Sequence, residues 1–124
     1  MKITSLLFLF IGLATQAQNT PTISEKEVSR IVTELASDKM EGREIFSSGI
    51  EMASKFIEGE FATIGLSNYN NLKTYRQDFK KNGKAANNVI GIIPGKSKSD
   101  EFVIFSAHYD HLGLDKNEVD KVFN

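Results

Sequence analysis

The fold is decided by the stretch Phe102-Val103-Ile104-Phe105, four consecutive apolar residues that lead directly into a polar segment, residues 106–113. A short unbroken apolar run predicts a central β-strand that is buried on both faces, because a half-buried strand would alternate apolar and polar residues. Burial on both faces requires helices above and below the sheet. The stretch therefore predicts an α/β fold.

Two helices are expected before this strand. Ser24 and Glu27 form a capping-box pattern, which predicts a helix over residues 24–36 with one apolar stripe: Val28, Ile31, Val32 and Leu35. A second helix is expected to begin near Ser48 and to end at Gly65, which is suited to a left-handed C-cap. Its apolar face is formed by Ile50, Ala53, Phe56, Ile57, Phe61 and Ile64. The segment between the helices, residues 37–43, lacks periodicity and is predicted to be a loop.

Two further strands are expected between the second helix and the apolar run. Residues 74–79 alternate and predict a half-buried edge strand, which a charged turn at 80–84 follows. Residues 88–93 predict another strand, which ends at Pro94-Gly95, and 96–100 read as a polar hairpin loop. Three strands cannot bury both faces with only two helices, so helices beyond Asn124 are expected. The chain therefore predicts an α/β sandwich that is incomplete here.

The amino terminus has the pattern of a signal peptide. Lys2 gives a positive start, residues 6–13 are an apolar run, and Ala17 follows small and polar residues. The run is shorter than the roughly 20 apolar residues that span a bilayer. We expect a signal peptide over 1–17, a linker over 18–23, and export to the bacterial periplasm or the extracellular medium without membrane insertion after cleavage. An amphipathic or membrane-anchored amino terminus is the alternative.

Composition excludes some classes of partner and of stabilisation. The formal net charge is -1, which predicts neither a nucleic-acid partner nor an anionic lipid surface. The chain has no cysteine, so no disulfide can stabilise it. Its own core, a metal ion or additional protein must therefore supply the stability.

The segment after the apolar run carries the candidate chemistry. His108 and Asp110 lie two residues apart, so on an extended segment their side chains point the same way. Neutral imidazole is the commonest side-chain metal ligand, and a nearby carboxylate can accept its other ring N–H. The spacing by itself leaves a second interpretation open, in which His108 and His111 are only solvated. Glu41 and Arg43 are interpreted as a loop salt bridge or a cap.

Residues 106–113 (SAHYDHLG) resemble the first metal-ligand segment of M28 metallopeptidases, the aminopeptidase family. Residues 35–43 are similar to the loop after the first helix of that family, and 48–66 to the helix that follows it. Residues 87–95 resemble the strand and turn before the buried strand. The resemblance covers residues 24–124, which we interpret as the amino-terminal part of an M28 peptidase domain.

The resemblance implies a zinc exopeptidase with a three-layer α/β sandwich, of the phosphorylase/hydrolase-like type, and two zinc ions. It implies that His108 binds one metal ion and that Asp110 supports this histidine in catalysis. Tyr109 and His111 lie beside the site without a required ligand role. The implied reaction is hydrolysis of amino-terminal peptide bonds in a peptide or protein substrate.

The sequence departs from the family pattern at its end. The family continues with a bridging aspartate, an acidic pair, a further acidic ligand and a last histidine, and Asp115, Glu118 and Asp120 match none of these positions. We therefore expect these 124 residues alone to be inactive. Two other functions stay open, a glutaminyl-cyclase-like acyltransferase of the same fold and a truncated, non-catalytic exported binding module. The oligomeric state is not indicated.

Overall fold

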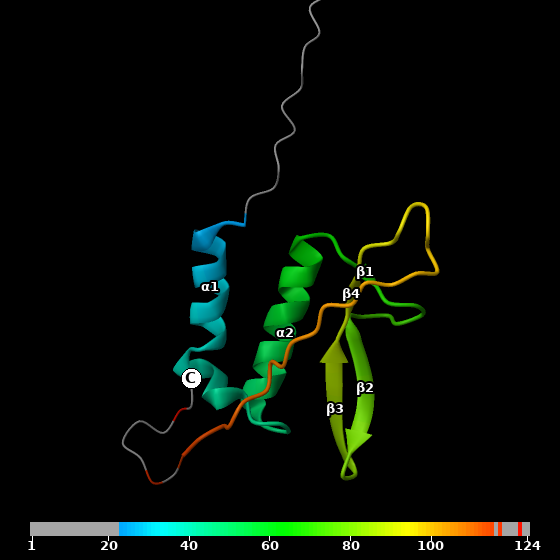
Figure 1. Cartoon of the computed structure of the whole chain (residues 1–124). Coiled ribbons are helices and arrows are strands. Elements are labelled where there is room, and N and C mark those ends of the chain that lie inside the picture. The colour runs from blue at the N-terminus through cyan, green and yellow to red at the C-terminus, as the bar shows by residue number, and fades with distance from the viewer. Residues whose placement is uncertain (1–22, 116, 118–121, 123–124) are drawn as a thin grey trace, which may run out of the picture.

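The computed structural model describes residues 23–115, 117 and 122, and shows helices followed by short antiparallel strands (Figure 1). The elements in chain order are α1 (Glu25–Leu35), the 3-10 helix η1 (Asp38–Arg43), α2 (Ser48–Thr63), β1 (Ser67–Asn68), β2 (Arg76–Lys81), β3 (Lys84–Val89) and β4 (Gly91–Ile92). Strand β1 pairs with β4, and β2 pairs with β3. The mixed α/β content is as predicted. The predicted signal peptide, and the predicted linker apart from Ile23, lie outside the described residues.

Helix α1 begins, and helix α2 ends, where the predicted capping residues lie. The Ser24 side chain accepts a hydrogen bond from the Glu27 amide at 3.4 Å, so Ser24 is the N-cap of α1. After α2, Gly65 has a φ of 74°, and the Leu66 amide donates to the Phe61 carbonyl at 3.0 Å. This is the Schellman arrangement, in which a residue without Cβ adopts the left-handed conformation at low cost. Among the described residues, no helix is long and apolar enough to cross a membrane.

The prediction of a loop over residues 37–43 is wrong for most of that segment, which forms η1. This 3-10 helix is irregular, because Glu41, Gly42 and Arg43 have φ values of 49°, 61° and 50°. A 3-10 helix of one or two turns carries too few residues to show an amphipathic period. Periodicity therefore could not reveal it, although the glycine did mark the stretch of positive φ.

A small core lies where η1 meets the start of α2. Met40 and Ala53 are almost fully buried, and so is Ser54. The helix can approach η1 closely because Gly49 faces the Met40 carbonyl, and no side chain would fit between them. A second, smaller cluster forms at the other end of α2, where the Phe61 ring meets the Tyr75 ring edge-on with centroids 5.7 Å apart.

The predicted apolar faces of the helices are only partly buried. Helix α1 contributes no buried residue, and Val28 and Val32 of its stripe are exposed. Ile64, predicted on the inner face of the second helix, is also exposed. An apolar stripe is buried only when another layer covers it, and the described residues supply no such layer over α1. Polar contacts link the two helices instead, since Arg30 donates to both carboxylate oxygens of Glu60 at 2.9 and 2.6 Å.

The hairpin β2–β3 is tighter and longer than predicted. Its turn consists of Asn82 and Gly83, whose φ values of 53° and 78° are both positive, and Lys81 pairs with Lys84. Two residues with positive φ form the type I′ turn that Asn-Gly favours, because its twist matches that of paired strands. The charged residues 80–84 therefore belong mostly to the strands. Strand β2 begins at Arg76 rather than at residue 74, and it is largely exposed rather than half-buried.

The strand predicted over residues 88–93 is divided between two sheets. Residues 88 and 89 complete β3, while Gly91 and Ile92 form β4 and pair with β1. Gly91 permits this change of partner, since a Cβ there would meet the side chains of Leu66 and Phe61. The polar segment 96–100 is irregular, as predicted.

The prediction of a buried central strand over 102–105 is wrong for the part of the chain that the structure describes. These residues pair with no described strand, and Phe102 and Phe105 are 59% and 94% exposed. In Figure 1 the segment belongs to the orange trace that runs from the β4 side of the molecule to the η1 side. It lines an open groove with α2 and β3. A central strand requires neighbouring strands and covering helices, and the described residues provide neither here.

The contact between α2 and η1 can be tested with two glycines of the same helix. Replacing Gly49 by alanine would drive its Cβ into the Met40 carbonyl, whereas a Cβ on Gly59 would meet no atom within 4 Å. We expect Gly49→Ala to lower the free energy of unfolding by about 1–3 kcal/mol, the usual cost of overpacking. Gly59→Ala should raise it by about 0.5–1 kcal/mol through helix propensity. Urea denaturation measures both, and a similar effect of the two substitutions would contradict the packing.

Candidate functional site

The structure brings His108 and Asp110 together. The Nδ1 atom of His108 lies 2.9 Å from Oδ1 of Asp110, and the two side chains are 95% and 45% exposed. An ionised carboxylate only accepts hydrogen bonds, so this contact places the proton of the neutral imidazole on Nδ1. The lone pair on Nε2 is then free and faces solvent. This arrangement leaves one imidazole nitrogen available to a metal ion.

The described residues supply one such donor rather than a complete metal site. In the described part of the chain, no three His, Cys, Asp or Glu side chains come together as a set of metal ligands. A catalytic zinc ion takes three protein ligands and a water. The donor set fits a single ligand position, and the metal-binding role of His108 stays a prediction. The side chain of His111 is exposed, while its amide donates to the Arg43 carbonyl at 2.9 Å.

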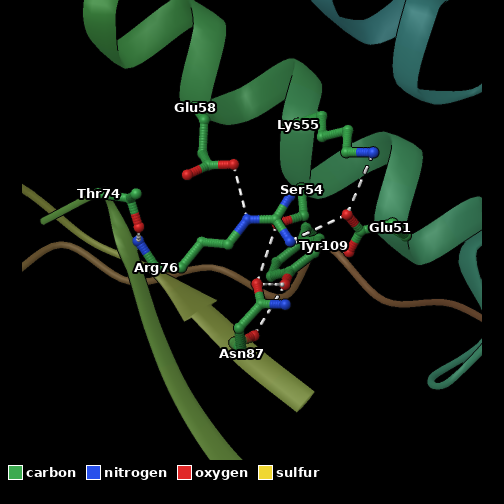
Figure 2. A network of polar contacts seen from close by, with 8 residues as sticks. All are labelled: Glu51, Ser54, Lys55, Glu58, Thr74, Arg76, Asn87 and Tyr109. Carbon is green, nitrogen blue, oxygen red and sulfur yellow. Dashed lines mark hydrogen bonds and ion pairs between the residues drawn. The ribbon is translucent and has the colours of Figure 1, made fainter. Parts of the chain in front are cut away.

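Tyr109, which lies between His108 and Asp110 in the sequence, anchors this segment to the rest of the fold. Its hydroxyl donates to Asn87 of β3, with the main-chain oxygen at 2.8 Å and Oδ1 at 3.0 Å. The buried Ser54 of α2 donates to the same Oδ1 at 2.9 Å, which completes the network in Figure 2. Burial is the main reason that the pKa of Tyr109 is raised. The hydroxyl therefore stays protonated and can donate at neutral pH. The sequence placed Tyr109 beside the site but did not predict this role.

An ion-pair network holds the hairpin on α2. Arg76 at the start of β2 donates from Nε to Glu58 at 2.6 Å and from Nη1 to Glu51 at 2.8 Å (Figure 2). The hydrogen bond from Arg76 is the main cause that lowers the pKa of Glu51. The hairpin carries Asn87, so this network also fixes the anchor of Tyr109. Neither charge spacing nor periodicity in the sequence predicted it, since the partners lie 18 and 25 residues apart.

Arg43 provides a third connection, from η1 to the site segment, residues 108–113. Its Nε atom donates to the Tyr109 carbonyl at 2.9 Å, and its Nη1 atom donates to the Leu35 carbonyl at the end of α1. Arg43 therefore caps the carboxyl end of α1 at the Leu35 carbonyl, as one of the two interpretations expected. Its contact with the Tyr109 carbonyl was not predicted. Glu41, the other charged residue singled out in this segment, accepts a hydrogen bond from the Ser48 hydroxyl.

Comparison with known proteins gives one family match, which covers the segment that carries the candidate site. The sequence profile of peptidase family M28 matches residues 88–120, about a quarter of the 124-residue chain. This match supports membership of peptidase family M28. The matched M28 segment contains His108, Tyr109 and Asp110, and it supports a hydrolase of the peptidase kind. No curated protein and no solved structure gives a match.

The Tyr109 anchor can be tested by removing a single oxygen atom. Tyr109→Phe deletes the hydrogen bonds to Asn87, and we expect the free energy of unfolding to fall by about 1–2 kcal/mol. Tyr69→Phe is the matched control, because Tyr69 is 37% exposed and its change should stay within about 0.5 kcal/mol. Thermal or urea unfolding measures both. Equal effects of the two substitutions would show that the Tyr109 hydroxyl anchors nothing.

The Arg76 network predicts a pH dependence of stability. The folded-state pKa of Glu51 is lowered, so the pair stabilises the fold above the unfolded-state pKa and loses this effect as pH falls through the lowered value. We expect Arg76→Gln to lower the free energy of unfolding by on the order of 1 kcal/mol at neutral pH, and by clearly less below about pH 4. Lys98→Gln, which breaks an exposed pair with Glu101, should change stability by less than about 0.5 kcal/mol. A cost of Arg76→Gln that does not depend on pH would contradict the pairing.

Proposed function

We propose that this chain is part of an M28-type zinc exopeptidase that removes amino-terminal residues from peptides or proteins. The observation that carries the proposal is the hydrogen-bonded pair of His108 and Asp110, which lies inside the segment that matches family M28. A peptidase-type reaction follows from the family match. The zinc dependence and the aminopeptidase specificity are the parts that we add.

The proposed role of each residue follows from its contacts. Asp110 accepts the Nδ1–H of His108, which holds the neutral imidazole in one tautomer and raises the basicity of Nε2. His108 then offers Nε2 as a ligand, and its 95% exposure leaves room for a metal ion and a substrate. A zinc ion held by His108 and further ligands would supply a bound water of lowered pKa and would polarise the peptide carbonyl. Tyr109 and Arg43 hold the main chain between the two side chains in place.

The proposal extends to the fold and to a second metal ion. Two zinc ions need several further ligands, among them a shared carboxylate, beyond those that the described residues supply. We propose that the active protein has a three-layer sandwich fold. The exposure of the apolar run 102–105, together with the uncovered stripe of α1, supports a fold with additional layers.

Export and the class of partner belong to the same proposal. The charged start, apolar run and small residues of positions 1–17 support a signal peptide and a periplasmic or extracellular location. A net charge near zero supports a peptide or protein substrate rather than a nucleic acid. A secreted enzyme without cysteine does not depend on disulfides, so a bound metal would also contribute to its stability.

The proposal is tested with the full-length protein, an aminoacyl chromogenic substrate and three matched variants. Zinc content and hydrolysis should both be lost in His108→Ala. Asp110→Asn should bind zinc about 10–100-fold more weakly, since it removes only the partner of the ligand. His111→Gln should retain both properties, because it changes an equally accessible imidazole in the same segment. A chelator should abolish the hydrolysis, and added zinc should restore it.

The same experiment separates the proposed function from its alternatives. Peptides with an amino-terminal glutamine distinguish the two reactions, because an exopeptidase releases the glutamine and a glutaminyl cyclase converts it to pyroglutamate with release of ammonia. Hydrolysis that persists in His108→Ala, or in the presence of the chelator, would contradict the zinc peptidase proposal. Absence of either reaction in a zinc-loaded, folded protein would favour the binding module.

A further inference from the structure

The turn at Gly42 and Arg43 is hydrogen-bonded to the main chain of the site segment, residues 108–113. The amide of His111 donates to the Arg43 carbonyl, and the amide of Gly113 donates to the Gly42 carbonyl, each at 2.9 Å. The Arg43 side chain adds the bond to the Tyr109 carbonyl, across 66 positions of sequence. One short turn thus binds the site segment at three successive alternate residues: Tyr109, His111 and Gly113.

The Tyr109 carbonyl is the most informative of these contacts. It belongs to the peptide group that joins Tyr109 to Asp110, and so it lies between the two side chains of the candidate site. Fixing a peptide plane fixes the directions in which the flanking residues leave it, because the backbone has only two soft dihedrals per residue. The Arg43 guanidinium therefore acts on the angle between His108 and Asp110 without touching either side chain.

Packing cannot orient the pair, so the main chain has to do it. The His108 side chain is 95% exposed, and Asp110 is 45% exposed. An exposed side chain has few neighbours that select a rotamer, and a site that must hold its geometry needs support from a rigid surrounding. Among the described residues, Arg43 supports this stretch from one side and the Tyr109 hydroxyl supports it from the other.

The close approach of the two segments is built into the backbone. Glu41 and Arg43 are not glycines, yet both have positive φ, which costs roughly 1–2 kcal/mol for each residue. At Gly42, between them, a Cβ would collide with the Gly113 carbonyl. Strain of this kind persists only where surrounding contacts enforce it, and it gathers at functional sites. Here the strained turn is the element that presents Arg43 to the site segment.

We propose that Arg43 is a positioning residue for the His108–Asp110 pair. Its guanidinium spans two main-chain carbonyls, Leu35 at the end of α1 and Tyr109 in the site, so it ties the orientation of the pair to the first helix. The planar fork of arginine can serve both acceptors, whereas the single ammonium of lysine can follow only one of them with good geometry. The catalytic importance of this positioning rests on the proposed function, but the positioning itself does not.

The test reads the tautomer of His108 directly, in the full-length protein without metal. Histidine labelled with ¹⁵N distinguishes a proton on Nδ1 from one on Nε2 by nuclear magnetic resonance, and His108→Gln and His111→Gln variants assign the signals. In the unmodified protein we expect His108 to carry its proton on Nδ1. Arg43→Gln should give a mixture of the two tautomers, and hydrogen-exchange protection of the His111 and Gly113 amides should fall about tenfold. Arg43→Lys should give a tautomer ratio and an amide protection between those of the unmodified protein and those of Arg43→Gln.

The control is Arg30→Lys, which changes an arginine that also joins two elements by ion pairs but contacts no residue of the site. It should leave the His108 tautomer and both amides unchanged. If Arg43→Gln does not fold, Arg43→Lys decides the question. A folded Arg43 variant whose His108 keeps its proton on Nδ1 would overturn the inference. Because the readout needs neither zinc nor substrate, a tautomer shift in a protein without peptidase activity would uphold the positioning role while rejecting the proposed function.

Discussion

The arrangement of the helices and the candidate site depends on one constraint, the hydrogen bonds between the left-handed turn at Gly42–Arg43 and the site segment. They are the point at which the carboxyl-terminal part of the described chain returns to its amino-terminal helices. The close approach is possible because Gly42 and Gly113 both lack a Cβ. Helix α2 meets the same element through Gly49 and Met40. One irregular turn thus connects α1, α2 and the candidate site, although it contains no regular α-helix or strand.

A second anchor acts on the opposite side of the same peptide segment. Through its hydroxyl, Tyr109 reaches Asn87, and Ser54 of α2 binds the same amide oxygen. The hairpin that carries Asn87 is itself held on α2 by Arg76. The main chain at Tyr109 is therefore fixed from η1, and its side chain is fixed from β3. The side chains of His108 and Asp110 are left facing solvent on a segment whose main chain is held from two sides.

Local signals predicted the parts of this structure that depend on neighbouring residues. Ser24 and Gly65 marked the ends of the helices, because capping hydrogen bonds close within one turn. The spacing of His108 and Asp110 predicted their contact for the same reason. The bond from Arg43 to Tyr109 had no such signal, since its partners lie 66 residues apart and neither belongs to a periodic pattern. The strand predicted at 102–105 failed because pairing depends on other segments, and an apolar run cannot show whether they are present.

The exposed run 102–105 nevertheless stands in a defined position. Strand β4 pairs with β1 before it, and the anchors of Tyr109 follow it, so both of its flanks are tied to the folded part of the chain. A segment that is restrained at both ends loses less conformational entropy when it gains a strand partner than a free segment of the same length. The hydrogen bonds of the site segment form here although the run 102–105 pairs with no described strand. These bonds in turn restrict the positions in which the run could meet a strand partner.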